Sequence, residues 1–142
     1  MKFTNIKKDL INSIIILVAL MFFGLILSSL SVFFFPKDAY SLGAKIDIIR
    51  TLPLPFLLYL FIVRVFAEEI FFRGLLTNKI GIFFSSVVFG IMHAGYFSFL
   101  EIFGAFALGL VLAYFYKKNG TLVPNIVAHI IYNLTVLFFL TF

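Results

Sequence analysis

The chain has 142 residues, of which 63% are hydrophobic and 12% are charged, and its mean hydropathy is +1.19. A soluble domain of this length cannot bury so much apolar surface, so the composition excludes one and predicts a membrane protein. The net charge is +5, but the cations lie mainly at the ends of apolar runs, where they orient membrane helices, so we expect no nucleic-acid partner.

The apolar runs predict an all-α, polytopic transmembrane bundle of about five helices, since each run approaches the roughly 20 residues that cross a bilayer. We expect residues 1–142 to form a single membrane domain. Residues 36–50 are mixed in charge and predict a loop that could include an interfacial helical turn. The first run is too long for a signal peptide, so it should remain as a helix. The predicted helices cover residues 10–35, 52–76, 80–97, 100–117 and 121–141.

The positions of the cations predict the orientation. If successive helices alternate in direction, three cationic groups fall on one side, which the positive-inside rule assigns to the cytoplasm. The chain would then be a multi-pass protein of the cell membrane with a cytoplasmic N-terminus. The groups are Lys2, Lys7 and Lys8, then Arg73 and Lys79, then Lys117 and Lys118.

Small residues recur every four positions in the fourth predicted helix, at Ala105, Gly109 and Ala113. This spacing lets two helix backbones approach closely. We interpret the stripe as helix packing within the chain, and self-association stays open.

Ionisable residues lie inside the second apolar run, at Glu68, Glu69 and Arg73. A charged side chain at the centre of a membrane helix costs roughly 2.5–3.5 kcal/mol, so such a group indicates a functional site. Glu69 and Arg73 are four residues apart with the acid first, which favours an ion pair. Glu68 points about 100° away from Glu69, so it is our candidate general base. A purely structural Glu-Arg network that ties helices together is the alternative.

The two histidines, His93 and His129, also lie in apolar runs. A single intramembrane histidine is more often a packing residue than a catalyst, but two of them beside a buried acid pair favour a site. Asn125 and Asn133 lie four residues before and after His129, so the three side chains line one stripe of the last helix.

An acid, two imidazoles and carboxamides can together hydrolyse an amide, because they supply a base for water and donors for the oxyanion. Other chemistries have less support. The sequence has no cysteine and no His-Glu-x-x-His zinc helix. The aspartates lie in or near polar segments, and Ser85 and Ser86 lack the context of a nucleophile.

The series Glu68-Glu69-x-x-x-Arg73, Phe89-x-x-x-His93 and His129-x-x-x-Asn133 resembles the motifs of the CAAX-protease and bacteriocin-processing family. The resemblance covers a motif-bearing core at about residues 60–140. It implies an intramembrane glutamate peptidase in which Glu68 and His93 activate water.

By the same resemblance His129 and Asn133 bind the oxyanion. Glu69 and Arg73, with Asn125, support the site, while Phe89 shapes the pocket wall. It also implies a membrane-associated peptide or protein substrate and a link to bacteriocin processing or self-immunity.

We expect no cofactor and no metal, although the family has been discussed as zinc-dependent, because a carboxylate and two histidines on separate helices do not establish a metal site.

A helical rise of 1.5 Å per residue would place His93 about 20 Å from Ile80, so the third helix should start late, near Phe83, or tilt. The alternative function is a non-catalytic immunity or interaction protein that uses the polar core for helix packing.

Overall fold

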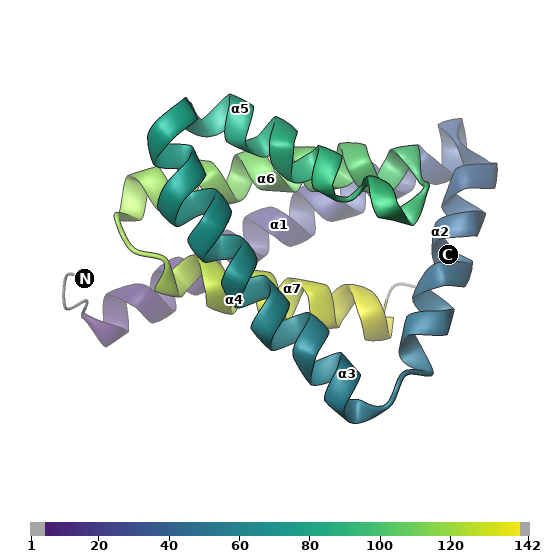
Figure 1. The fold of residues 1–142 in the computed structure, drawn as a ribbon, viewed down its shortest axis with the longest axis horizontal. Helices are drawn as coiled ribbons and strands as arrows, with labels where there is room; N and C mark the ends of the chain where they lie inside the picture. The colour runs from purple at the N-terminus through teal and green to yellow at the C-terminus, as the bar shows by residue number, and fades with distance from the viewer. Residues whose placement is uncertain (1–4, 140–142) are drawn as a thin grey trace.

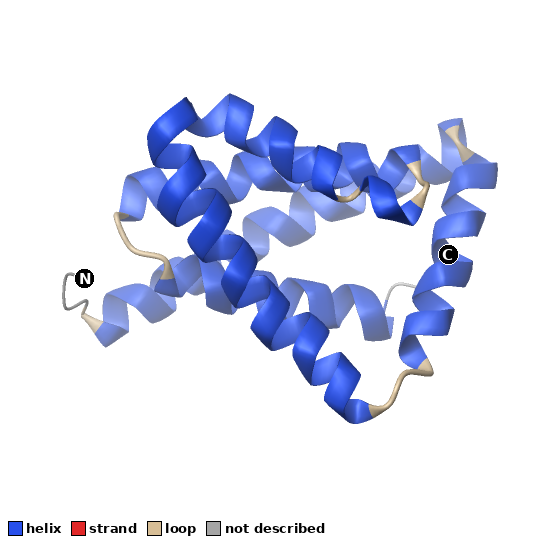
Figure 2. Ribbon diagram, in the orientation of Figure 1, coloured by secondary structure: helices blue, strands red, loops and turns tan. Residues whose placement is uncertain are grey.

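The computed structural model describes residues 5–139, which are helical apart from short connections and contain no strand (Figure 2). This confirms the prediction of an all-α bundle, and each of the five predicted helices corresponds to a helical segment. Four consecutive elements, α3 to η2, form one rod over residues 54–76, in which η1 and η2 are π-helical. The elements are α1 (Ile6–Phe34), α2 (Pro36–Arg50), α3 (Leu54–Leu58), η1 (Tyr59–Arg64), α4 (Val65–Glu68), η2 (Glu69–Leu76), α5 (Thr77–Met92), η3 (Ala94–Tyr96), α6 (Phe99–Asn119) and α7 (Val123–Phe139).

The third predicted helix differs most in its boundaries. Within α5 the chain bends sharply at Gly81, whose φ of 83° and ψ of 175° are not helical and suit glycine. The straight part of α5 therefore begins at Ile82, which agrees with the expected late start. It ends at Met92 instead of residue 97, and His93 caps it. The predicted residues 140 and 141 of the last helix, and Lys2, lie outside the described residues.

The prediction of a loop at residues 36–50 was wrong, because the segment is the helix α2. Pro36 opens the helix, Asp38 lies in its first turn and Arg50 in its last, so these residues suit the ends and the helix dipole. The Asp38 carboxylate accepts hydrogen bonds from the Ser98 hydroxyl at 3.1 Å and the Leu100 amide at 2.9 Å, at the start of α6. Arg50 donates to the Leu137 carbonyl of α7. These contacts fix α2 across one end of the bundle (Figure 1).

The helices α1, α5, α6 and α7 run lengthwise, and the rod of residues 54–76 crosses them obliquely (Figure 1). The helix α6 contacts both α1 and α5. One apolar cluster joins α1, α6 and α7, and a second joins the rod, α5 and α6. The first comprises Ile16, Leu20, Leu112 and Ala128, and the second comprises Phe72, Phe89 and Ala105.

The helices α5 and α6 pack closely, and glycines at their contact face the opposite helix. A Cβ at Gly90 would lie 2.8 Å from the Ile102 carbonyl oxygen, and one at Gly109 would lie 3.1 Å from a ring carbon of Phe89. Ala105, Gly109 and Ala113 are buried. The predicted packing role of the small-residue stripe is therefore confirmed within the chain.

The outer surface is apolar. Both α1 and α6 are long and apolar enough to cross a membrane, and α7 is a shorter apolar helix. Large side chains such as Phe22, Phe33, Phe84 and Phe138 are more than half exposed. In water this surface would be costly, so it supports the placement of the chain in lipid.

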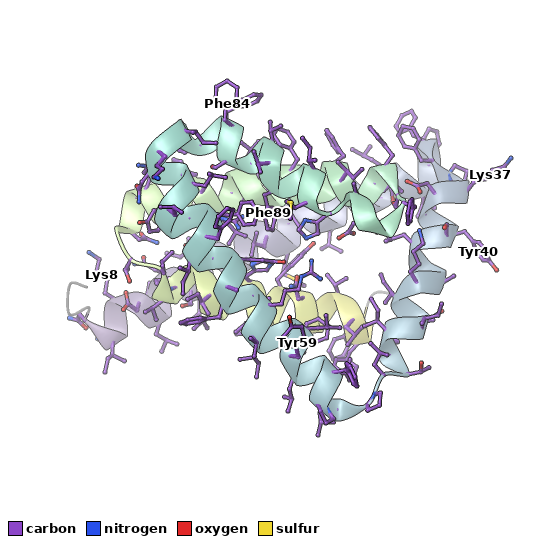
Figure 3. All side chains as sticks on the ribbon, in the orientation of Figure 1. Lys8, Lys37, Tyr40, Tyr59, Phe84 and Phe89 are labelled. Atoms are coloured by element: carbon purple, nitrogen blue, oxygen red, sulfur yellow. The ribbon has the colours of Figure 1, made fainter. Side chains whose placement is uncertain are left out.

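Exposed cations of α1 and α6 lie at the same end of the bundle. The Asn78 amide donates to the Tyr116 hydroxyl at 3.0 Å and its oxygen accepts from the Lys117 ammonium at 2.8 Å, so the start of α5 lies beside the end of α6. Lys8 lies at this end and Lys37 at the other (Figure 3). Which end faces the cytoplasm stays a prediction.

We predict that Gly90→Ala destabilises the protein by about 1–3 kcal/mol, because the new methyl group would push α6 away from α5. Gly104→Ala, in the partner helix α6, is the matched control, since a Cβ there has nothing within 4 Å. It should leave stability unchanged or raise it by up to about 1 kcal/mol. The measurement is the unfolding midpoint of the purified variants in detergent. Equal midpoints for the two variants would contradict the close approach.

Candidate active site

A cavity of about 240 Å³ opens between α1, α2, the rod, α5, α6 and α7. Most of its wall is apolar, and its ionisable side chains come from several helices. Five of the predicted site residues line this cavity. They are Glu68, Phe89, His93, His129 and Asn133.

The remaining predicted residues form a buried cluster around Glu69, behind the cavity. One carboxylate oxygen of Glu69 lies 3.1 Å from Nη1 of Arg73 and 2.8 Å from Nδ1 of His129. The other accepts a hydrogen bond from the Asn125 amide at 3.3 Å, and the same amide donates to the Leu112 carbonyl at 2.7 Å. The predicted Glu69–Arg73 ion pair is thus present, and Asn125 belongs to this cluster.

Phe89 separates this cluster from His93. The guanidinium carbon of Arg73 lies 4.2 Å from the centre of the Phe89 ring, a distance at which the ring face stabilises a cation. The same ring is 4.6 Å from the His93 ring in an edge arrangement. Phe89 points into the bundle, whereas Phe84, earlier on the same helix, points outward (Figure 3). Phe89 is thus held between two polar groups.

Glu68 lines the cavity and has an ion-pair partner of its own. Its Oε1 accepts a hydrogen bond of 2.7 Å from Nε of Arg64, four residues earlier in the rod. The Glu68 side chain is 14% exposed and that of Arg64 33% exposed, so the pair is shielded but reaches the cavity. The two consecutive glutamates therefore have separate cationic partners.

His93 lies where α5 ends, with its backbone already out of the helical region. Its Nδ1 is 2.8 Å from the Phe89 carbonyl oxygen, and its Nε2 is 3.4 Å from Nη2 of Arg64. The residue is nearly buried. Arg64 therefore contacts both Glu68 and His93, which come from different helices.

The rod is not a regular α-helix around these residues. The π-helical segments η1 and η2 stand on either side of α4, which ends at Glu68. Wide turns of this kind are rare and occur frequently at functional sites. The Thr77 hydroxyl closes the second segment by donating to the Phe72 carbonyl at 2.8 Å.

Sequence reasoning missed four ionisable residues that line the cavity, namely Lys45, Arg64, Glu101 and Tyr132. Arg64 stands four residues before Glu68, so the spacing rule applied to Glu69 and Arg73 would have found it. No local pattern marks the other three, because they reach the cavity only through the packing of α2, α6 and α7.

The residues do not fit a catalytic metal. Among residues 5–139, no three side chains of histidine, cysteine, aspartate or glutamate come together as a metal-binding group. The guanidinium of Arg64 lies beside the Glu68 carboxylate and would repel a divalent cation placed there. Glu69 and His129 are bonded to each other.

Comparisons with known proteins bear on this arrangement. The chain matches the family model described as type II CAAX prenyl endopeptidase Rce1-like over residues 50–135. It is 31% identical over 99 residues to the protein called uncharacterized protein YpbD of Bacillus subtilis (strain 168), which covers 68% of this chain and 52% of YpbD. The chain thus spans about half the length of this curated relative. No solved structure matches it.

The matched region covers more than half of the chain and includes every residue of the cavity and cluster that the sequence motifs singled out. It also agrees with the apolar exterior, which indicates a membrane protein. The chain therefore belongs to the Rce1-like family of type II CAAX prenyl endopeptidases.

Proposed function

We propose that this chain is an intramembrane peptidase that hydrolyses a peptide bond of a membrane-associated protein or peptide by means of a glutamate-activated water. One observation carries the proposal. Glu68 and His93, from different helices, meet the same guanidinium at the wall of a shielded cavity, which His129 and Asn133 also line. The family supports the reaction class.

In this mechanism Glu68 is the general base for a water held between its carboxylate and His93. The carboxylate takes a proton as the water oxygen bonds to the peptide carbonyl carbon, and the electron pair of the C=O bond moves to the carbonyl oxygen. When the intermediate collapses, the C–N bond breaks and the proton passes from Glu68 to the leaving nitrogen. The site then regains its carboxylate.

Asn133 and His129 are the proposed donors to the oxyanion. The Asn133 carboxamide can donate without a change in charge. Nδ1 of His129 faces the Glu69 carboxylate, which only accepts, so Nδ1 carries a hydrogen. Nε2 of His129 can therefore donate only when the ring is an imidazolium, and Glu69 lies where it would stabilise that charge.

The proposed substrate is bound by the apolar part of the cavity. Side chains from α1, α2 and α7 surround the polar wall, and they suit an apolar peptide segment. They include Leu20, Leu27, Leu42, Ile46, Val136 and Leu137. The positive end of the bundle would face the cytoplasm. We expect this cleavage to serve either the processing of a bacteriocin or self-immunity.

We predict that Glu68→Gln abolishes peptide cleavage, with a loss of at least about 10²-fold, because an amide cannot accept the proton. The purified chain in lipid vesicles would be incubated with a mixture of apolar membrane-inserting peptides in ¹⁸O-labelled water. Mass spectrometry should find one ¹⁸O atom in each new carboxyl group.

Asp47→Asn is the matched control for that variant, since Asp47 is exposed on α2 and pairs only at the surface with Arg50. It should cleave at the wild-type rate. Wild-type cleavage by Glu68→Gln would refute the glutamate mechanism. Failure of the wild-type protein to cleave any membrane peptide would favour the non-catalytic immunity or interaction function.

We predict that Arg73→Ala lowers the steady-state amount of protein, because it leaves the Glu69 charge buried and lacking its main cation. The expected loss of stability is about 3–5 kcal/mol. Quantitative immunoblotting of membrane fractions would measure it, with the exposed Lys79→Ala as control. Glu68→Gln should accumulate normally, and an equally abundant Arg73→Ala would disprove the anchoring role of the cluster.

We predict that cleavage persists after exhaustive treatment with strong chelators. The proposed base and donors are protein groups, whereas a zinc enzyme would lose activity and regain it with added metal. The measurement compares initial rates before and after chelation, together with the metal content of the active protein. Chelator-sensitive activity that is restored by stoichiometric zinc would overturn the assignment.

A further inference from the structure

Arg64 lies outside the three sequence motifs, yet it is the residue that joins Glu68 to His93. We propose that Arg64 is a positioning residue for water activation, which holds the Glu68 carboxylate and keeps Nε2 of His93 as a hydrogen-bond acceptor. This inference rests on the proposed function and names a further residue in the same site. It depends on the chemistry of three side chains and one backbone carbonyl.

The first step concerns the guanidinium, which carries only donors. Its Nε donates to Oε1 of Glu68 at 2.7 Å, and its Nη2 lies 3.4 Å from Nε2 of His93. A hydrogen on Nε2 would point at the hydrogens of Nη2. The contact therefore requires a lone pair on Nε2.

The second step is independent of Arg64 and leads to the same tautomer. Nδ1 of His93 lies 2.8 Å from the Phe89 carbonyl oxygen, which can only accept. Nδ1 must therefore carry the hydrogen of the neutral ring, and Nε2 must carry the lone pair. Both sides of the ring specify the neutral form with hydrogen on Nδ1.

This tautomer determines how a water can be held. The contact of Nε2 with Nη2 is long, at 3.4 Å, so the lone pair on Nε2 can be shared with one hydrogen of the water. The Glu68 carboxylate accepts the other hydrogen, so the oxygen lone pairs are left to face the substrate carbonyl. The guanidinium is a rigid planar fork, so it fixes the carboxylate and the imidazole relative to each other across two helices. A lysine at this position could pair with Glu68 but has no such fork.

The tautomer can be measured directly, because the sequence has only two histidines. The wild-type protein with ¹⁵N-labelled histidine would be reconstituted in lipid vesicles, and the two rings assigned with His93→Gln. We expect a single neutral form of His93 with hydrogen on Nδ1. Hydrogen on Nε2 of His93 would overturn the proposal without any activity assay.

Substitution of Arg64 tests the link to the reaction. We expect Arg64→Met to lower kcat about 10²-fold and Arg64→Lys to lower it about tenfold, with KM within about twofold of wild type. In Arg64→Met the ¹⁵N signal of Nε2 of His93 should shift, because Nε2 loses its contact with Nη2, while the Nδ1 signal of His93 and the signals of His129 stay. Lys79→Met, which removes an exposed cation that does not line the cavity, is the matched control and should match the wild type in both measurements.

Wild-type kcat and unchanged His93 signals in Arg64→Met would overturn the proposal. If Arg64→Met fails to accumulate because Glu68 has lost its cation, the double variant Arg64→Met with Glu68→Gln removes both charges. The ¹⁵N-histidine spectrum of this double variant then tests the contact between Arg64 and His93. A His93 signal identical to that of the wild type would contradict the positioning role of Arg64. The proposed function is tested separately, because it fails if Glu68→Gln cleaves peptides at the wild-type rate. The histidine spectrum tests only the contact between Arg64 and His93.

Discussion

The structure depends on the burial of the Glu69 carboxylate. A charge that is removed from water must find its compensation within the protein, and Glu69 does so through Arg73, His129 and Asn125. Two of these residues come from α7, so the carboxylate fixes that helix against the rod. The same contact orients the His129 ring, because it takes up Nδ1 and directs Nε2 away from the cluster. The position of a proposed oxyanion donor thus follows from one buried charge.

Two consecutive glutamates are placed in different environments by the turn of a single helix. Glu69 faces inward and is fully enclosed, whereas Glu68 faces the cavity and remains partly accessible. Each has an arginine four residues away, one before and one after it. Glu69 therefore holds the helices together, whereas Glu68 has the proposed role of accepting a proton. This difference also explains why replacement of each arginine should have a different effect.

Part of the cavity wall comes from elements that contain none of the family motifs. The helix α2 lies across one end of the bundle, where the Asp38 carboxylate accepts a hydrogen bond from the start of α6 and Arg50 donates one to α7. Its residues Leu42, Lys45 and Ile46 line the cavity. Residues from α1, α2, the rod, α5, α6 and α7 thus line a common space around Glu68.

The sequence by itself determined the helical class, the membrane character, the Glu69–Arg73 pair and the packing role of the stripe containing Gly109. These features depend on hydrophobicity and on spacing along one helix, which a regular rise and turn make readable. Only the tertiary structure decided that His129 binds Glu69, that Lys45 and Glu101 reach the cavity, and that residues 36–50 form a helix fixed to α6 and α7. Such contacts join residues far apart in the chain, and they depend on helix crossing and on the bend at Gly81, which no local pattern specifies.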